Sequence, residues 1–195
     1  MQVTRLTLIC HARTVAQKLA RFPMDEPVEM DWEVARGTRG AHFKSTARVL
    51  CGPELRTRQT AQLFAAQAQV VAALADYDVG RWHGQRIGDL QKTEPEVLER
   101  WLGDPNAAPH GGESVTQLCT RVADWLQTLT HTAGHVVAVT HPFVIRAALV
   151  QVMHCAPTAF NLIDIEPLSA VELRFNGRWR LRVQDVGADC ERITP

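Results

Sequence analysis

The sequence predicts an α/β fold in which a mainly parallel sheet lies between two layers of helices. Three short apolar runs have the pattern of buried strands, and a helical pattern follows the second and the third, which is typical of strands that alternate with helices in a parallel sheet. The C-terminal part instead has strand-like segments with no helical pattern between them, and a strong hairpin turn joins two of these. We therefore expect a three-layer α/β sandwich with an antiparallel C-terminal end.

The apolar runs predict three strands, and helical patterns after two of them predict the helices that follow. Residues 3–10 form the first buried strand. Residues 47–51 form the second, and an amphipathic helix follows over about 54–68. The third strand, at 135–140, leads into a helix over roughly 142–153. That helix starts with a proline, which suits the first turn because the missing N–H costs nothing there.

The remaining elements are a long helix and the C-terminal strands. Residues 113–131 have apolar side chains at helical spacing, and Ser114 lies close enough to the start to cap the helix. Asn176-Gly177 predicts the turn of the C-terminal hairpin. Residues 23–46, rich in proline and glycine, are not assigned to any element. The strand-like segments lie near 159–165, 169–175 and 179–185.

Composition favours one cytoplasmic domain over residues 1–195, with no repeat or linker. The 21 Lys and Arg residues balance the 21 Asp and Glu residues, so net charge gives no argument for a nucleic-acid or membrane partner. No signal-peptide core is present, and no apolar stretch approaches the roughly 20 residues of a membrane span. Five scattered cysteines without a C-x-x-C pair indicate reduced thiols and no zinc site. The oligomeric state is left open, a homodimer included.

Side chains that suit an oxyanion follow each of the three predicted parallel strands. His11 follows the first strand and His141 the third, whereas Arg56 and Arg58 follow the second. The carboxyl ends of parallel strands collect ligands at one edge of a sheet, where helix N-termini offer free N–H groups to anions. A neutral imidazole is also a competent nucleophile toward phosphorus. The residues alone therefore predict a phosphate-handling site.

These segments resemble the motifs of the histidine phosphatase superfamily, also called the phosphoglycerate mutase-like family. That family opens with a strand ending in R-H-G, then a Thr or Ser two residues later; His11 falls on its phosphorylated histidine and Thr14 on the Thr or Ser. GPELRTRQTA, at 52–61, resembles S-P-L-x-R-A-x-Q-T-A and places Arg56 at the phosphate-binding arginine. VTHP resembles V-S-H-G and places His141 at the second catalytic histidine.

Two further motifs follow in the family order. LADYDVGRWHG, at 74–84, resembles L-x-E-x-x-x-G-x-W-E-G and places Asp76 where the proton-donating glutamate stands. Asp76 is one methylene shorter than glutamate, so Asp78 is kept as the second candidate for the proton donor. PHGGES, at 109–114, resembles P-x-G-E-S with one extra residue. The resemblance spans residues 6 to about 150 and implies a phosphoglycerate mutase-like fold.

The resemblance implies a phosphatase that hydrolyses a small phosphorylated metabolite, a phosphomonoester, in two steps. Neutral His11 attacks phosphorus, and Asp76 protonates the leaving oxygen. Arg56 and protonated His141 bind the phosphoryl oxygens. Water then cleaves the phosphohistidine, and no metal or cofactor is implied. A phosphomutase is the less favoured alternative, because the chain is short between its motifs.

Three departures from the motif surround His11. Cys10 stands at the phosphate-binding arginine, Ala12 at the glycine, and Arg13 where an acidic residue or glutamine is usual. Arg13 would restore the missing charge by turning into the phosphate-binding site. Otherwise the enzyme is slower or tuned to an uncommon substrate, or the protein is a non-catalytic phospho-ligand binding module. An Arg13 directed into solvent beside a buried Cys10 would favour a weakened or redirected site.

Overall fold

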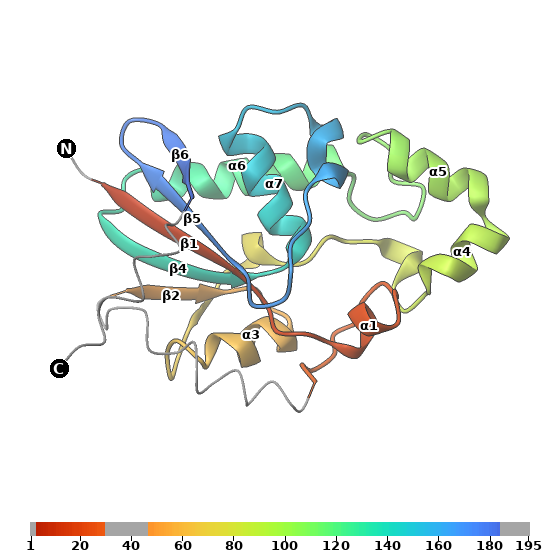
Figure 1. Ribbon diagram of the computed structural model, residues 1–195, viewed down its shortest axis with the longest axis horizontal. Helices are drawn as coiled ribbons and strands as arrows, with labels where there is room; N and C mark the ends of the chain where they lie inside the picture. The colour runs from red at the N-terminus through yellow and green to blue at the C-terminus, as the bar shows by residue number, and fades with distance from the viewer. Residues whose placement is uncertain (1–2, 30–46, 184–195) are drawn as a thin grey trace.

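The computed structural model describes residues 3–29 and 47–183, which form a mixed sheet with helices on both faces (Figure 1). The strand order is β3-β2-β4-β1-β5-β6. Strands β3, β2, β4 and β1 are parallel, whereas β5 and β6 are antiparallel. The predicted fold class is thus confirmed. The strands are β1 Thr4–Cys10, β2 Arg48–Cys51, β3 Gln69–Val70, β4 Gly134–Thr140, β5 Ala170–Phe175 and β6 Trp179–Arg182.

Two long helices cover one face of the sheet and a shorter helix covers the other. Figure 1 shows α6 and α7 above the sheet, α3 below it, and α1, α4 and α5 beyond the ends of the parallel strands. The α-helices are α1 Val15–Lys18, α3 Leu55–Ala61, α4 Ile87–Thr93, α5 Pro95–Gly103, α6 Val115–Leu129 and α7 Pro142–Val152. The 3-10 helices are η1 Ala72–Leu74, η2 Gly80–Trp82 and η3 Pro157–Leu162.

The central strand β1 explains why its sequence is a continuous apolar run. Leu6 and Leu8 belong to the large core that also contains the buried side chains of α6 and α7. Ile9 points the other way, into a smaller core with Ala61 of α3. A strand buried on both faces has no polar alternation, as expected for a parallel sheet covered by two helical layers.

Local signals in the sequence correctly predict several element boundaries. Ser114 accepts a hydrogen bond from the Gln117 N–H at 3.2 Å and so caps α6. Gly177 has φ of 77°, the left-handed conformation that a tight hairpin turn between β5 and β6 requires. Helix α3 is shorter than predicted and ends at Ala61, after which the chain leads by turns to the edge strand β3.

The strand predicted at 159–165 is wrong. The segment forms the 3-10 helix η3, which starts at Pro157. Its one buried side chain, Phe160, stacks on Phe143 of α7 with ring centroids 5.8 Å apart. A short apolar segment does not distinguish a strand from a helical turn, and here packing against α7 decides the conformation.

Some predicted regions extend beyond the described residues. Most of 23–46 and the end of the 179–185 segment lie outside them. The cysteines within the described ranges, Cys10, Cys51, Cys119 and Cys155, are free thiols, and Cys190 lies outside. Within the same ranges, no helix has the length and apolar character needed to cross a membrane.

Candidate active site

His11 directly follows β1 and is buried, with 3% of its surface exposed. Its Nδ1 lies 2.7 Å from the Ala12 carbonyl oxygen. A carbonyl only accepts, so Nδ1 bears the hydrogen and Nε2 of the neutral ring keeps its lone pair. Burial, reinforced by His141, lowers the pKa of His11 to about 3. The ring is therefore neutral at physiological pH, in the tautomer expected of a nucleophile.

The backbone around His11 is held by its two neighbouring elements. The His11 N–H donates to the Thr140 carbonyl at the end of β4, at 2.9 Å. The Ala12 N–H donates to Thr60 Oγ1 on α3, at 2.9 Å, and that hydroxyl donates in turn to the Arg56 carbonyl at 2.7 Å. Thr60 therefore fixes the position of Ala12, whose carbonyl oxygen sets the tautomer of His11.

His141 follows β4 and is fully buried at the start of α7. Its ring meets that of His11 edge to face, with centroids 5.2 Å apart. Nε2 donates to Glu54 Oε2 at 2.7 Å, and Nδ1 lies 3.2 Å from Asp76 Oδ2. Burial by itself would lower the pKa of His141, but the two carboxylates outweigh it and raise the pKa. The surroundings therefore favour an imidazolium.

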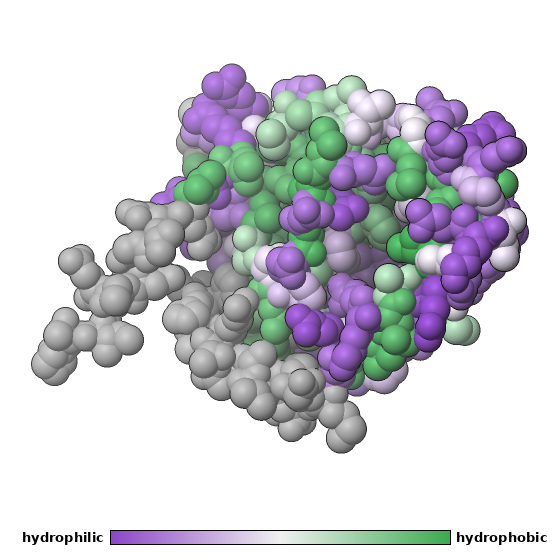
Figure 2. Space-filling view, turned by 45° about the vertical axis from the view of Figure 1, so that its right-hand side comes forward, coloured by the Kyte–Doolittle hydropathy of each residue, from purple (hydrophilic) through white to green (hydrophobic). Residues whose placement is uncertain are grey.

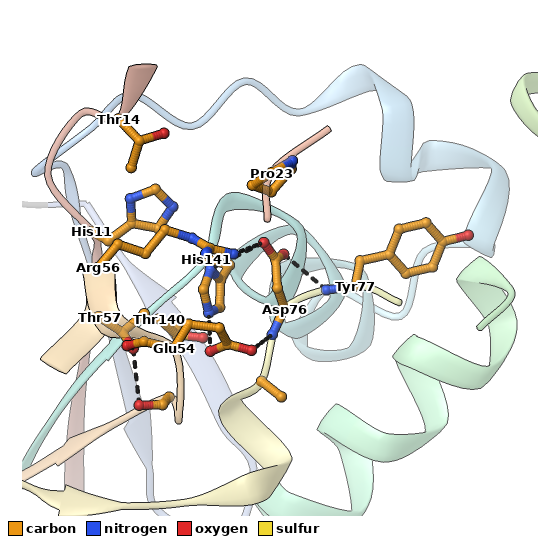
Figure 3. Close-up of polar contacts among 12 residues, drawn as sticks. His11, Thr14, Pro23, Glu54, Arg56, Thr57, Asp76, Tyr77, Thr140 and His141 are labelled. Carbon is orange, nitrogen blue, oxygen red and sulfur yellow. Dashed lines mark hydrogen bonds and ion pairs between the residues drawn. The ribbon is translucent and has the colours of Figure 1, made fainter. Parts of the chain in front are cut away.

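Arg56, in the first turn of α3, is 2% exposed. One terminal nitrogen pairs with Asp76 Oδ2 at 2.5 Å, and the other donates to the Met24 carbonyl at 2.9 Å. Arg56 Nε and Thr14 Oγ1 are buried and have no hydrogen-bond partner in the described ranges. Figure 3 shows Arg56 and Thr14 around the His11 ring. Unpaired buried donors are costly, which points to an acceptor such as an oxyanion that completes this site.

Asp76 connects the two cationic groups. Its Oδ2 meets Arg56 and His141, and its Oδ1 accepts from the Tyr77 N–H at 2.8 Å (Figure 3). Burial raises the pKa of Asp76, but His141 and Arg56 outweigh that effect and hold the pKa well below its usual range. The second candidate, Asp78, is exposed and faces His83 at 3.4 Å, away from this inner group.

Glu54 is a site residue that the sequence reasoning missed. It precedes α3, and its carboxylate accepts from His141 Nε2 and, at 2.9 Å, from the Asp76 N–H. Gly52 makes this contact feasible, because a Cβ there would lie 2.9 Å from Glu54 Oε2 and 3.2 Å from His141 Nε2. The available signal was an acidic residue where the resembling motif has leucine.

The structure does not bring Arg13 to the site. Arg13 is exposed, and its side chain makes no hydrogen bond or ion pair with any described residue. Cys10 is fully buried in the core shared with α6 and α7, where burial raises the pKa of its thiol to about 12. This is the arrangement expected of a weakened or redirected site, not of one in which Arg13 replaces the motif arginine.

A pocket of about 530 Å³ opens beside these residues. Figure 2 shows hydrophilic side chains bordering a hollow on the face turned forward from Figure 1. Within residues 3–29 and 47–183, no group of three or more His, Cys, Asp or Glu side chains is arranged to hold a metal ion. The polar lining consists of Asp25, Glu54, Arg56, Asp76, Asp78 and His83.

The arrangement supplies the parts of phosphoryl transfer. A neutral imidazole with a free lone pair lies beside a guanidinium and an imidazolium, and the guanidinium lines the pocket together with the carboxylates that pair with these cations. Such a set suits nucleophilic attack on phosphorus with stabilisation of the charge on the phosphoryl oxygens.

Comparison with known proteins identifies the family. Residues 6–186 match the family model described as histidine phosphatase superfamily (branch 1). The chain is 30% identical over 129 residues to the bifunctional protein Rv2228c of Mycobacterium tuberculosis, covering 61% of this chain and 35% of that protein. It is 30% identical over 124 residues to an acid phosphatase of the same organism, covering 60% and 59%. The chain thus spans about a third of the first of these relatives and less than two thirds of the second.

Solved structures share the fold. The phosphoserine phosphatase of Entamoeba histolytica, in complex with phosphoserine, superposes with a TM-score of 0.83 at 18% identity, covering 92% of this chain and 95% of that one. A putative alpha-ribazole-5'-P phosphatase from Escherichia coli gives 0.81 at 21% identity, covering 92% and 95%. With the family model matching nearly the whole length, the chain belongs to the histidine phosphatase superfamily, branch 1.

Proposed function

We propose that the protein is a phosphatase that hydrolyses a small phosphomonoester through a phosphohistidine intermediate on His11. The observation that supports this most strongly is the hydrogen bond from His11 Nδ1 to the Ala12 carbonyl, in a ring whose pKa is depressed to about 3. Together they leave Nε2 unprotonated inside a buried, cation-lined site. A nucleophile needs that state of the ring.

In the first step, His11 Nε2 forms a bond to phosphorus while the bond from phosphorus to the ester oxygen breaks. The electron pair of the broken bond stays on the ester oxygen, which takes a proton from Asp76 and leaves as an alcohol. Arg56 and His141 donate to the phosphoryl oxygens, and Arg56 Nε and Thr14 Oγ1 are donors without another partner among the described residues.

Asp76 must be protonated before it can act in this step, and its ion pairs oppose this. In the unliganded site Asp76 is paired with Arg56 and His141, which keeps its pKa low and the carboxylate unprotonated. A bound phosphoryl group competes for the same two cations and adds negative charge beside the carboxylate. Both changes raise the pKa of Asp76, so that on substrate binding Asp76 takes up a proton from solvent, which it then donates to the ester oxygen.

In the second step, water attacks the phosphorus of the phosphohistidine. Asp76, now a carboxylate, takes the proton of that water, and His11 leaves as a neutral imidazole. The products are inorganic phosphate and the starting enzyme, and the sequence of steps requires no metal ion. The acid phosphatase relative supports this reaction class.

The experiment is a hydrolysis assay with p-nitrophenyl phosphate and a panel of phosphorylated metabolites. His11→Ala should abolish turnover and leave the fold intact, because His11 lies at a strand end outside the apolar cores. His131→Ala, at an exposed histidine, is the matched control and should keep full activity.

Two outcomes would contradict the proposal. Hydrolysis that persists in His11→Ala would show that His11 is not the nucleophile. Phosphate or phosphomonoester binding without turnover, with His11→Ala changing only the affinity, would identify a phospho-ligand binding module. This second function is included because Cys10 is buried and Arg13 is exposed, so neither residue supplies the charge of the motif arginine.

A further inference from the structure

The pocket that Arg56 and Asp76 line is acidic. Four carboxylates line it, whereas Arg56 is the one Lys or Arg among its described lining residues. The negative charge also exceeds that of the motif, because Glu54 stands at a leucine position and Cys10 at an arginine position. Both departures shift the charge of the site in the same direction. The four carboxylates belong to Asp25, Glu54, Asp76 and Asp78.

The inner two carboxylates already have cationic partners. Glu54 and Asp76 lie against the two nitrogens of His141, and Asp76 also pairs with Arg56. Arg56 nevertheless keeps a buried Nε with no partner in the described part of the chain. The inner end of the pocket is therefore balanced in charge and still lacks an acceptor, as the phosphoryl end of a substrate would require.

The outer two carboxylates have no cationic Lys or Arg partner among the described residues. Asp25 Oδ1 accepts from the Leu55 N–H at 2.7 Å, and Asp78 Oδ1 accepts from the Gly80 N–H at 2.9 Å. These bonds orient each carboxylate and leave its second oxygen available. The neighbouring arginines are engaged elsewhere, Arg21 with Glu26 and Arg81 with Glu94.

His83 ties together the two loops that present the outer carboxylates. Its Nδ1 donates to the Pro23 carbonyl at 2.9 Å, and its Nε2 lies 3.4 Å from Asp78 Oδ1. The loop with Asp25 is thereby joined to the loop with Asp78. Asp25 and Asp78 thus line one pocket from two loops whose contacts hold them in place, and such preorganisation lowers the cost of binding a matching charge.

The orientation of a bound phosphomonoester follows from the proposed function, on which this inference rests. Its phosphorus lies at His11, and its ester oxygen lies toward Asp76. The leaving group then extends along the pocket toward Asp25 and Asp78. An anionic leaving group would meet two carboxylates that have no Lys or Arg partner among the described residues, of which Asp78 faces only His83, whereas a cationic leaving group would pair with them.

We propose that the substrate is a phosphomonoester whose alcohol carries a cationic nitrogen, an ammonium or quaternary ammonium group, which binds between Asp25 and Asp78. The phosphoryl group and the cation lie at opposite ends of the same pocket. Asp25 and Asp78 are then specificity-determining residues for the leaving group.

The test compares substrates that differ only in this charge. Phosphocholine and 3,3-dimethylbutyl phosphate have the same shape, with carbon in place of the quaternary nitrogen in the second. The kcat/KM for phosphocholine should exceed that of the neutral analogue by about tenfold or more, as the electrostatic attraction between the cation and the two carboxylates predicts. Phosphoethanolamine should likewise exceed propyl phosphate, and phosphoglycolate should be the poorest substrate. The preference should weaken as salt is added.

Variants of Asp25 and Asp78 then test whether these two carboxylates cause the preference for the cationic substrate. Asp25→Asn and Asp78→Asn keep the size of each side chain and remove its charge, so each should lower the ratio of the two kcat/KM values. The double variant should bring that ratio close to one. Asp124→Asn, at an exposed position on α6, is the control and should keep the wild-type ratio. An unchanged ratio in the double variant would overturn the proposal.

The assay separates failure of this inference from failure of the proposed function. Hydrolysis of p-nitrophenyl phosphate with equal kcat/KM for phosphocholine and its neutral analogue refutes the cationic substrate and leaves the phosphatase in place. Absence of all hydrolysis refutes the phosphatase, and calorimetric Kd values for the same two compounds then decide the inference. Tighter binding of phosphocholine supports it, and equal binding overturns it.

Discussion

The two sides of the active site are built in different ways. On the sheet side, His11 and His141 directly follow adjacent parallel strands, and Arg56 lies in the first turn of α3; all three are buried. On the loop side, Asp25 and Asp78 are exposed and come from segments joined by the contacts of His83. The first side is fixed by the fold itself, and the second by contacts between loops.

This difference assigns different roles to the two sides. Groups that act on a reacting phosphorus must be held rigidly, and strand ends in a packed sheet provide that rigidity. Loops tolerate changes of sequence without loss of the core, so they are where a substrate preference is set. We expect changes on the sheet side to act on kcat, and changes on the loop side to act on the choice of leaving group.

After the loss of turnover expected for His11→Ala, the largest effects should come from the two cationic groups of the sheet side. Arg56→Ala and His141→Ala should each lower kcat/KM by about 10²–10³, because each removes a donor to the transferring phosphoryl group. Steady-state kinetics with p-nitrophenyl phosphate measures this. Arg58→Ala, at an exposed position on the same helix, is the control for Arg56. A change in KM alone for His141→Ala would show that His141 only binds the ground state.

A smaller effect is expected where the two sides meet. In Gly52→Ala, the new Cβ would lie 2.7 Å from the Leu74 carbonyl oxygen and 2.9 Å from Glu54 Oε2. The backbone must shift, at a cost of about 1–3 kcal/mol in the free energy of unfolding. The shift should also disturb the pair between Glu54 and His141 and lower kcat by about tenfold.

Thermal unfolding and kinetics on the same variant test this expectation. Gly103→Ala has open space around its Cβ and serves as the control. Wild-type activity and stability in Gly52→Ala would show that Glu54 does not need its observed position.

The pH dependence of kcat/KM tests the pairing of Glu54 with His141, which lies where the two sides meet. His141 must be protonated to donate to phosphate, and its pKa is raised, so activity should persist above pH 6.5 and fall only at higher pH. Glu54→Gln removes one of the negative charges that raise this pKa. The pKa of His141 then falls, and the alkaline limb should move toward lower pH.

The acid side of the same profile has a different origin. The pKa of His11, at about 3, keeps that ring neutral through the assay range, so loss of activity below pH 6 should not come from His11. NMR titration of the histidine rings measures His141 directly. An alkaline limb that does not move in Glu54→Gln would contradict the assigned pairing.

The smallest effect is expected at Arg13. Its side chain is exposed and makes no hydrogen bond or ion pair with a described residue, so Arg13→Ala should change kcat/KM by less than about twofold. A loss of tenfold or more in the same kinetic assay would show that Arg13 moves into the site when substrate binds. The replacement of the motif arginine by Arg13 would then be restored as the explanation of Cys10.

The same contrast explains how far the sequence could predict the site. His11, Arg56 and His141 were recognisable because each follows a strand, and the ends of parallel strands meet at one edge of the sheet. The contact of Glu54 with His141 was not recognisable, since it depends on the direction of one side chain over Gly52.

The fold shows a similar division. Three of the four parallel strands, the cap of α6 and the proline that starts α7 follow from local patterns, whereas the short edge strand β3 does not. The 3-10 helix at Pro157–Leu162 does not, because the packing of Phe160 on Phe143 decides its conformation. The loop with Asp25 meets the loop with Asp78 only through the fold, so no spacing in the sequence predicts that pair.

The central claim, that His11 is the nucleophile, is tested most directly by trapping the intermediate. Rapid alkaline quenching during turnover of a phosphomonoester, followed by peptide mass spectrometry, should find an acid-labile, alkali-stable phosphoryl group on His11. The label should be absent from His11→Ala. A phosphoryl group on a different residue, or continued hydrolysis with no label on His11 at any time after mixing, would contradict the account.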